Sequence, residues 1–351
     1  MIYITDLACI SPQPTFDHTF FEGEVHIYKG ARYLAVEPGY TDIIPAGLLR
    51  RMGKAVRMGV GAGLSLLRHH PDIEGIILGT GNGGLEDCLK FLNQIVDYAE
   101  GTLTPTNFVQ STPNAVAGNL ALMGKLTGYN ATHVHKGLAF ENALLDAMML
   151  LEERKLHALL VGSVEEISDY NHNIDFLNGN FKEGDFTSET LLKTNTPGTV
   201  NGEGAAWFVV SDRKDQALAE IADITHTGNL AAEDLDNWVL HFLKRNQLEA
   251  SEVEMLMTGM NGDVRNDYFY TNLQAGLLKD RPVVTFKNVA GEHPTASAFA
   301  TWLAVHILSG SGVPASVVYS GSPAGIPRNI LLYNHHLGEQ HALILMRSVN
   351  R

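Results

Sequence analysis

The stretch Asn130–Lys155, NATHVHKGLAFENALLDAMMLLEERK, decides the fold, because it joins a short strand to a strong helix through Gly137. Such a strand-to-helix corner can expose a nucleophile at the start of a helix, where backbone N–H groups stabilise its anion. This corner contains no cysteine or serine. His135 could act as a base and Thr132 as a weak nucleophile, but neither residue alone makes an acyl-transfer site.

Strands and helices alternate outward from this corner in both directions. A buried strand is predicted at 75–81 (GIILGTG) before the corner and another at 157–166 (HALLVGSVEE) after it. The polar segment 170–197 is predicted to be a long surface excursion. Further strands are predicted at 1–11, 130–136 and 199–211, and helices at 45–70, 85–100 and 111–127. The alternation favours an α/β fold, with helices layered on mostly parallel sheets.

The order of elements begins again at about residue 213. The second half is predicted to contain strands at 219–227, 253–258 and 283–286, helices at 234–246 and 294–308, and a closing hairpin from 328–333 and 341–347. No linker rich in Pro, Gly or Ser separates the two parts. We therefore expect two similar halves, 1–212 and 213–351, that share one continuous core.

The composition argues against several classes of protein. The 351 residues carry a formal net charge of −14, and so acidic a chain repels the phosphate backbone of nucleic acids. No segment offers the ~18 consecutive apolar residues of a membrane span, and the N-terminus lacks the basic region of a signal peptide. With only Cys9 and Cys88, no disulfide framework is expected, and a cytoplasmic location is the simplest prediction.

The segment GTGNGG at 79–84 satisfies the pattern G-x-G-x-x-G between a predicted strand and a predicted helix. In a dinucleotide-binding enzyme these glycines bring backbone N–H groups to a pyrophosphate at the helix start. The acidic residues that would bind a ribose, Asp97 and Glu100, fall inside or at the end of that helix rather than at the tip of a second strand. A tight turn at the strand end is the simpler interpretation, and dinucleotide binding is the alternative.

Two other groups of ionisable residues allow both a functional and a structural interpretation. His133 and His135 alternate along a predicted strand, as two metal ligands can, but no third ligand stands at a matching spacing, so no metal site is expected. Lys287, Glu292 and His293 cluster in KNVAGEHPTASA (287–298), where close ionisable groups can tune one another's pKa values. The same segment is also consistent with an ordinary helix start.

Five strings, together with the corner, follow one another in an order that resembles the β-ketoacyl-acyl-carrier-protein synthases of the thiolase-like superfamily. They are ILGTGNGG (77–84), PTNFVQSTPNAVAGNLAL (105–122), LLVGSVEE (159–166), VNGEGAAWFVV (200–210) and VVTFKNVAGEHPTASA (283–298). The resemblance runs along nearly the whole chain. It implies a duplicated fold of five alternating layers, α-β-α-β-α, with two mixed five-stranded sheets.

The resemblance does not extend to the family's nucleophile. Members of the family have a cysteine three residues before a glycine at the corner. Alignment on Gly137 puts Val134 at that position, and a shift by one residue puts His135 there. Cys9 and Cys88 stand in other elements. The thiol that would accept the acyl chain is therefore missing.

The family's other catalytic residues also carry over poorly. Asn261 takes the place of the first histidine, and Glu292 takes the place of the second, with His293 one residue later. Of this set, only Lys287 matches outright, and the closing glycine-rich turn is replaced by YNHHLG at 333–338. Because these groups activate decarboxylation and hold the enolate, the chain is not expected to run the full condensation cycle.

The resemblance instead implies a ketosynthase-like subunit. Chain-length factors lack the cysteine, pair with an active ketosynthase and help to shape the tunnel for the growing chain. The segments LAFENALLDAMM and GEHPTASA look especially like ketosynthase-like proteins from aryl-polyene and flexirubin-type pigment clusters. The leading hypothesis is such a subunit of fatty-acid or polyketide-type biosynthesis, without a cofactor, acting on chains bound to an acyl-carrier protein.

Partners and alternatives follow from the same resemblance. The chain is expected to form a homodimer, or a heterodimer with a cysteine-bearing ketosynthase, through the helix near 114–122. Carrier proteins are acidic and need a local basic patch, which Arg50, Arg51, Lys54 and Arg57 supply unless they form an ordinary solvated helix face. One alternative is an acyltransferase or decarboxylase that uses the residues His135, Lys287 and Glu292 or His293 in place of a thiol, and the other is a dinucleotide-binding enzyme.

Overall fold

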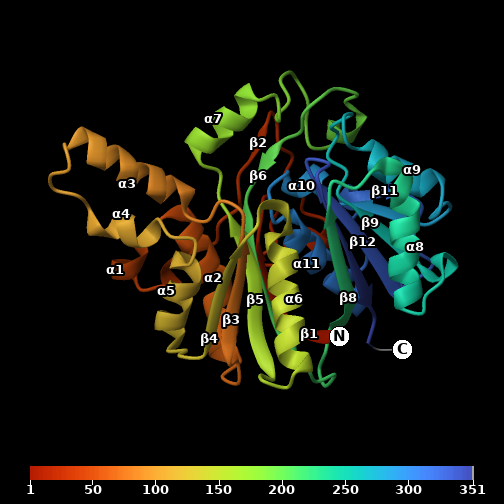
Figure 1. Cartoon of the computed structure of the whole chain (residues 1–351), viewed down its shortest axis with the longest axis horizontal. Coiled ribbons are helices and arrows are strands. Elements are labelled where there is room, and N and C mark those ends of the chain that lie inside the picture. Colours follow the sequence, from red (N-terminus) through yellow and green to blue (C-terminus); the bar gives the residue numbers. More distant parts are fainter. Residues whose placement is uncertain (350–351) are drawn as a thin grey trace.

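A computed structural model describes residues 1–349, and its strands form one large mixed sheet and a small two-stranded pair (Figure 1). The strands of the large sheet are β1 (Ile2–Ile10), β3 (Gly75–Thr80), β4 (Tyr129–Val134), β5 (Ala158–Glu165), β7 (Gly204–Ser211), β8 (Ala219–Gly228), β9 (Met255–Thr258), β10 (Val283–Thr285), β11 (Val318–Ser320), β12 (Asn329–His336) and β13 (Gln340–Arg347). The small pair is β2 (Arg32–Tyr33) with β6 (Asn201–Gly202). The α-helices are α1 (Ala46–Leu49), α2 (Lys54–His69), α3 (Leu85–Asp97), α4 (Pro105–Gln110), α5 (Ala115–Gly124), α6 (Ala139–Glu152), α7 (Asp169–Leu177), α8 (Leu235–Arg245), α9 (Tyr268–Ala275), α10 (Lys287–Ala290) and α11 (Ala296–Ser309).

The large sheet contains the same five-strand arrangement twice. From its outer edge inward, one set runs β4-β3-β5-β7-β1, and the other runs β10-β9-β12-β13-β8. In each set the first three strands are parallel and the last two are antiparallel to their neighbours. Helix α6 connects β4 to β5, and α11 connects β10 to β12, as parallel strands require. The duplicated α/β fold expected from the sequence is confirmed, and residue 212 falls in the connection between β7 and β8.

One detail differs from the expectation of two separate five-stranded sheets. The innermost strands of the two sets, β1 and β8, pair antiparallel through Ile2–Ile4 and Ala219–Ile221 and join the sets into one continuous sheet. Strand β11 adds an eleventh strand at the edge beside β10. The join satisfies backbone groups that would otherwise be two open edges inside the core.

Three hydrophobic cores separate the layers. The central core packs α6 and α11 between the inner faces of both halves of the sheet, and α2 with α5 and α8 with α9 cover the two outer faces (Figure 1). The side chains of β9 alternate between two cores, as expected for a strand. Met255 and Met257 pack in the central core, whereas Leu256 packs in an outer one. Among residues 1–349, none of the helices combines the length and the apolar character needed to cross a bilayer.

The helices depart from the sequence expectations in several places, and α4, α9 and α10 were not predicted. The helix predicted at 45–70 is broken into α1 and α2 at Gly53, where a Cβ would overlap the carboxylate of Asp87. The helix predicted at 111–127 is shorter, because α5 covers Ala115–Gly124 only. The surface excursion at 170–197 contains α7, which buries only His172 and so has almost no apolar periodicity to reveal it.

Candidate functional site

The corner between β4 and α6 turns through a short 3-10 helix, η3 (Lys136–Leu138), and is fastened to the β12–β13 hairpin. The N–H of Gly137 donates to Gln340 Oε1 at 2.9 Å, and a Cβ on Gly137 would overlap the side chain of His336. Lys136 has a left-handed backbone with φ of 47°, a conformation that costs a non-glycine residue roughly 1–3 kcal/mol. Close packing at Gly137 thus holds the corner against the hairpin.

Lys136 is the corner residue that lines the neighbouring cavity. Val134 lies at the end of the edge strand β4 and is 54% exposed. His135 is exposed as well, and its Nδ1 lies 2.7 Å from Asn142 Nδ2. The structure therefore brings Lys136 to the cavity and leaves the two residues that align with the missing cysteine outside it.

Neither cysteine of the chain belongs to this corner. Cys9 is buried in β1, where burial raises the pKa of its thiol to about 12 despite a hydrogen bond with Thr15. Cys88 is partly exposed on α3, in another layer. The arrangement supplies no reactive thiolate to the cavity.

The polar residues of β4 make structural contacts. His133 Nε2 lies 2.9 Å from Asp146 Oδ2, and Tyr129 donates to the same oxygen at 3.0 Å. Thr132 Oγ1 accepts a hydrogen bond from Asn114 at the start of α5. Within residues 1–349 there is no group of three or more His, Cys, Asp or Glu side chains arranged to hold a metal ion.

Lys287, at the matching corner of the second half, is completely buried in an ion pair. Its Nζ lies 2.7 Å from Glu292 Oε2 and donates to the carbonyl of His335 at 2.8 Å. Asn261 Nδ2 donates to the same Glu292 oxygen at 2.7 Å, and His336 Nδ1 lies 3.4 Å from the other oxygen. Burial alone would raise the pKa of Glu292, but the Lys287 ammonium and the contact with His336 outweigh it and hold that pKa far below its usual range.

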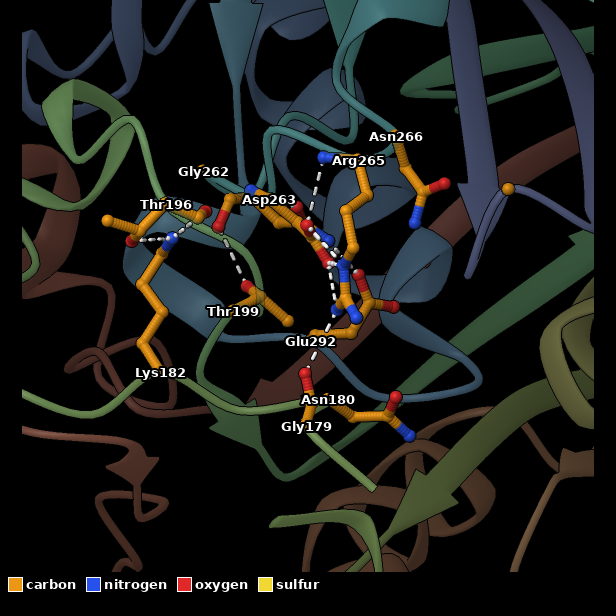
Figure 2. Close-up of polar contacts among 12 residues, drawn as sticks. Gly179, Asn180, Lys182, Thr196, Thr199, Gly262, Asp263, Arg265, Asn266 and Glu292 are labelled. Atoms are coloured by element: carbon orange, nitrogen blue, oxygen red, sulfur yellow. Dashed lines mark hydrogen bonds and ion pairs between the residues drawn. The ribbon is translucent and has the colours of Figure 1, made fainter. Parts of the chain in front are cut away.

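The loop that carries Asn261 is held against the segment 178–200, which includes the end of the surface excursion at 170–197 (Figure 2). Thr199 Oγ1 donates to the Asn261 carbonyl at 2.7 Å. The Arg265 guanidinium binds the Asp263 carboxylate, at 2.6 Å for Nη2–Oδ2, and also donates to the Gly179 carbonyl at 3.0 Å. These contacts connect the Asn261 loop to the segment that contributes Thr199 to the cavity wall.

Lys182 is a buried lysine in the same excursion. Its ammonium donates to the carbonyl of Thr196 at 2.6 Å and to the Thr196 hydroxyl at 2.8 Å. Burial lowers the pKa of Lys182, although the carboxylates of Asp263 and Asp267 partly oppose this shift. Thr196 also bridges to Asp263, so the excursion and the Asn261 loop form one connected unit.

The cavity beside these elements has a volume of about 290 Å³, and polar and apolar atoms contribute similar shares of its surface. Four asparagines line it, together with the carboxylates of Glu165, Glu166, Asp175 and Glu292. His293 lies in its wall and is 7% exposed, and its Nδ1 has no hydrogen-bond partner within residues 1–349. Burial lowers the pKa of His293 to about 3, so the ring is neutral near neutral pH.

The glycine-rich turn at 79–84 already holds a carboxylate. The N–H groups of Gly81 and Asn82 and the hydroxyl of Thr80 donate to the side chain of Glu165. A Cβ on Gly79 would overlap the backbone of α6 at Ala139. The glycines therefore serve a tight turn and close strand–helix packing, and Glu165 stands where a pyrophosphate would bind.

Glu166 accepts hydrogen bonds from the starts of two helices. Its carboxylate accepts from the N–H of Ala55 at 3.0 Å on α2 and from the N–H of Glu86 at 3.3 Å on α3. Burial raises the pKa of Glu165 and that of Glu166 to about 7, against the opposing effect of these hydrogen bonds.

The four basic residues of the proposed patch lie between the end of α1 and the first turn of α2, and their contacts differ. Arg57 Nε and Nη2 donate to the two oxygens of Glu37 at 2.7 and 2.8 Å. Lys54 pairs with the buried carboxylate of Glu203. Arg50 and Arg51 are exposed at the end of α1. The structure thus leaves a smaller basic surface than the sequence suggested.

The sequence did not single out several residues of the cavity. Lys136 was visible in the corner, and His336 was visible within YNHHLG, but neither matched a catalytic pattern. Arg265 and Asp263 stand two residues apart, a spacing that does not reveal their joint contact with Gly179. A lysine directly before the corner glycine was the available signal.

Comparison with known families agrees with this architecture. Residues 31–175 match the family described as the N-terminal domain of beta-ketoacyl synthase. No curated protein matches the chain. The resemblance to ketosynthases inferred from the sequence is confirmed by this match and by the fold.

Solved structures with the same fold cover almost the whole chain. A beta-ketoacyl synthase from Burkholderia phymatum STM815 has a TM-score of 0.77 and 16% identity, with 99% of each chain covered. A type II polyketide acyl-carrier protein in complex with its ketosynthase, AntDE:AntF, has a TM-score of 0.79 and 15% identity, again with 99% of each chain covered. The ketosynthase ApeO in complex with its chain length factor ApeC, from Xenorhabdus doucetiae, has a TM-score of 0.79 and 13% identity, covering 99% of this chain and 98% of the other.

Proposed function

We propose that this ketosynthase-like chain is a subunit of fatty-acid or polyketide-type biosynthesis that does not carry the acyl group itself. It acts as the chain-length-factor-like partner of a cysteine-bearing β-ketoacyl synthase, in the cytoplasm. The observation that carries the proposal is a complete ketosynthase fold whose strand-to-helix corner, at 130–138, has no thiol. Without a thiolate the corner cannot form the acyl-enzyme on which ping-pong condensation depends.

The second half of the site supports the same conclusion. Of the residues at positions related to catalysis, Lys287 has its charge neutralised by Glu292, and Asn261 donates its amide to that carboxylate. An ammonium that is fully buried in an ion pair has little capacity left to stabilise a developing enolate. The network therefore suits a structural role at the centre of the fold.

The face around β4 suits a partner subunit. β4 is an edge strand of the large sheet, so one side of its backbone is unpaired. Apolar residues are exposed on β4, on the adjoining helix α5 and on the projecting pair α3–α4: Val134 (54%), Leu122 (80%), Val96 (78%), Phe108 (57%) and Val109 (61%). Exposed apolar side chains are common at protein interfaces, and Leu122 belongs to the helix near 114–122 proposed for dimerisation.

An acyl-carrier protein is the second proposed partner. One solved structure of the same fold is a complex of an acyl-carrier protein with its ketosynthase. In this chain only Arg50 and Arg51 of the proposed basic patch are free of the Glu37 and Glu203 ion pairs. We therefore expect weak, salt-dependent docking of the carrier protein on this subunit.

Co-expression tests the proposal directly. The chain is co-expressed with the cysteine-bearing ketosynthase encoded nearest to its gene, and the pair is purified through a tag on one subunit. We expect a stable 1:1 complex whose condensation activity requires both subunits and whose product length changes when this chain is omitted or exchanged. An obligate monomer that leaves the partner's activity and product length unchanged contradicts the proposal.

Two alternatives remain testable on the isolated chain. An acyltransferase or decarboxylase without a thiol is favoured by the neutral, unpartnered ring of His293 in the cavity wall. It predicts turnover of malonyl- or acyl-thioesters by the chain alone and loss of that turnover in Lys287→Ala. If the chain is a dinucleotide enzyme, NAD(P)H should bind saturably in a fluorescence titration. We expect no binding, because Glu165 already accepts from the N–H groups of the turn.

A further inference from the structure

Helices α3 and α4 form an arm, residues 85–110, that projects from the body of the molecule (Figure 1). Within residues 1–349 no residue of the arm belongs to a hydrophobic core, and α3 packs chiefly on α4. The buried residues of the two helices are polar, Asp87 at one end of the arm and Gln110 at the other. Gln110 bonds to the backbone of Gly53 and Arg51. Because apolar burial contributes little here, the arm depends on polar contacts for its position.

Two consecutive glutamates at the end of β5 hold the start of α3, which we call the root of the arm. Glu165 accepts from two N–H groups of the glycine-rich turn at 79–84, directly before α3. Glu166 accepts from the N–H of Ala55 on α2 at 3.0 Å and from the N–H of Glu86 on α3 at 3.3 Å. One carboxyl group therefore joins the body of the molecule to the arm.

Four carboxyl groups meet at this root. Burial raises the pKa of Glu166 to about 7, and the nearby carboxylates of Asp87 and Glu86 add to the shift. Burial and the charge of Glu166 raise the pKa of Glu165 to about 7 as well, against its hydrogen bonds to the turn. Burial also raises the pKa of Asp87. Among the described residues, neither Glu165 nor Glu166 has a Lys, Arg or His side chain at ion-pair distance.

The charged groups that face the root do not neutralise it. Lys54 and Arg57, on α2, are paired with carboxylates outside the root. Lys90, on α3, lies 3.5 Å from Glu86 and 3.9 Å from Asp87, but its side chain is about half exposed to solvent. The titratable groups on the side of the cavity are Lys136, Asp175, Glu292, His293 and His336. Ionisation of the two glutamates therefore leaves buried negative charge that is largely uncompensated.

We propose that the root of the arm is a pH-sensitive hinge, in which the protonated carboxyl groups of Glu165 and Glu166 hold α3 against the body. When these groups ionise, the buried carboxylates repel one another, and movement of α3 away from β5 hydrates them. The hinge goes beyond the proposed subunit function, because it is a property of the isolated chain and needs no partner.

The direction of the pH dependence follows from the shifts. The pKa values of Glu165 and Glu166 in the closed arm, about 7, lie above that of a hydrated glutamate, about 4.3. The closed arm is therefore stabilised by these protons below the hydrated value, and this stabilisation is lost as pH rises through about 7. Opening of the arm should be rare in mild acid and frequent above neutral pH.

Hydrogen–deuterium exchange of the full-length chain near pH 5.5 and near pH 7.5 tests the hinge. The informative peptides span 80–88, which includes amides that are bonded to the two carboxyl groups. After division by the intrinsic exchange rate at each pH, one such glutamate shifts the opening equilibrium roughly twentyfold between these values. We expect the protection of 80–88 to fall at least about tenfold toward the higher pH, while that of α8 changes much less.

Variants assign the pH dependence to the two glutamates. Glu166→Gln keeps an acceptor but cannot ionise, so it should retain protection near pH 7.5 and weaken the pH dependence. Glu165→Gln should act in the same way, and it keeps the proposal testable if Glu166→Gln does not fold. Asp97→Asn removes an exposed carboxylate at the end of α3 and, as the matched control, should behave like the parent chain.

Three results overturn the proposal. The first is corrected protection of 80–88 that is equal at the two pH values or rises with pH. The second is an equal fall of protection in α8, which would indicate a change of the whole chain rather than of the arm. The third is a pH dependence that both glutamine variants leave unchanged.

Discussion

The two halves of the molecule place a lysine at the same topological corner and use it in opposite ways. Lys136 follows β4 and leads into α6, and Lys287 follows β10 and leads through α10 into α11. Lys136 is exposed to the cavity without an ionic partner, whereas Lys287 is fully buried against Glu292. One corner therefore leaves a charge at the edge of a cavity, and the other uses its charge to hold the core together.

This difference shows that the two corners of a duplicated fold can keep the same shape through different contacts. The corner at Lys287 is stabilised by Asn261, His336 and the carbonyl of His335 in addition to Glu292. The corner at Lys136 is stabilised by packing of Gly137 on the hairpin and by the hydrogen bond to Gln340. Neither set of contacts requires a thiol, so the geometry persists without one.

The largest expected effect is on stability at the buried corner. Lys287→Met leaves the Glu292 carboxylate unpaired in the core, which should lower the free energy of unfolding by about 3–5 kcal/mol. Lys136→Met, at the exposed corner, should change it by less than about 0.5 kcal/mol. Urea denaturation of both variants measures the contrast. The double variant Lys287→Met/Glu292→Met should recover much of the loss, and equal effects at the two corners would refute the comparison.

Close packing at the Lys136 corner predicts the next largest effect. Gly137→Ala places a Cβ against His336 and should destabilise the chain by about 1–3 kcal/mol, as overpacking does. Gly118→Ala in α5 is the matched control, because the nearest atom to its Cβ is 3.5 Å away and an alanine there suits the helix. Thermal unfolding compares the two. A neutral Gly137→Ala would mean that the corner does not depend on this contact.

Glu141, in the first turn of α6, is expected to make the free energy of unfolding depend on pH. The side chain is fully buried and neither oxygen meets hydrogen-bond geometry, although Ser297 on α11 lies close enough to oppose the shift slightly. Burial raises the pKa of Glu141 to about 7, so the folded state holds this proton between the usual carboxyl range and pH 7. The stability that the proton confers is therefore lost as pH rises through this window.

The variant Glu141→Gln tests that sign. It should match the parent chain near pH 5 and exceed its free energy of unfolding at pH 8 by of order 1–3 kcal/mol, because the amide never ionises. Glu153→Gln, which removes an exposed carboxylate paired with Lys155, is the control and should show little pH dependence. Chemical denaturation at the two pH values gives the difference. A stabilisation that is larger at pH 5 than at pH 8 would contradict the assignment.

The smallest expected effect concerns carrier docking. Arg50→Glu/Arg51→Glu should weaken binding of an acyl-carrier protein a few-fold at low salt and hardly at all at physiological salt, because only two free cations take part. The control variant is Arg154→Glu/Lys155→Glu, which makes the same change of net charge just after α6 and should not weaken docking. Surface plasmon resonance at two salt concentrations distinguishes them, and identical losses would indicate a non-specific charge effect.

Strong local patterns made most of the fold predictable from the sequence. All eight residues of β5 are buried, and α11 is buried along nearly its whole length, so continuous apolar runs identified both. The second half of the chain was also recognisable from the repeated order of such runs. α7 was not predicted, because it buries one histidine and otherwise has the composition of a loop.

The site depended on contacts that the sequence does not encode locally. Alignment on Gly137 directed attention to Val134 and His135, yet Lys136, which has a left-handed backbone, is the corner residue that lines the cavity. Glu165 reaches the glycine-rich turn from 84 residues away, and Lys287 lies beside a carbonyl 48 residues away. The closeness of Lys287 and Glu292 was visible in the sequence. That the two charges neutralise each other in a buried ion pair could be seen only in the folded structure.

Intact-protein mass spectrometry of the purified complex tests the central claim most directly. The complex of this chain with its cysteine-bearing ketosynthase is incubated with acyl-carrier protein that carries an acyl chain, and each subunit is then weighed. The mass of the acyl group should appear on the partner alone, and substitution of the partner's cysteine should abolish it. An acyl group on this chain, or condensation by this chain without a partner, would contradict the account.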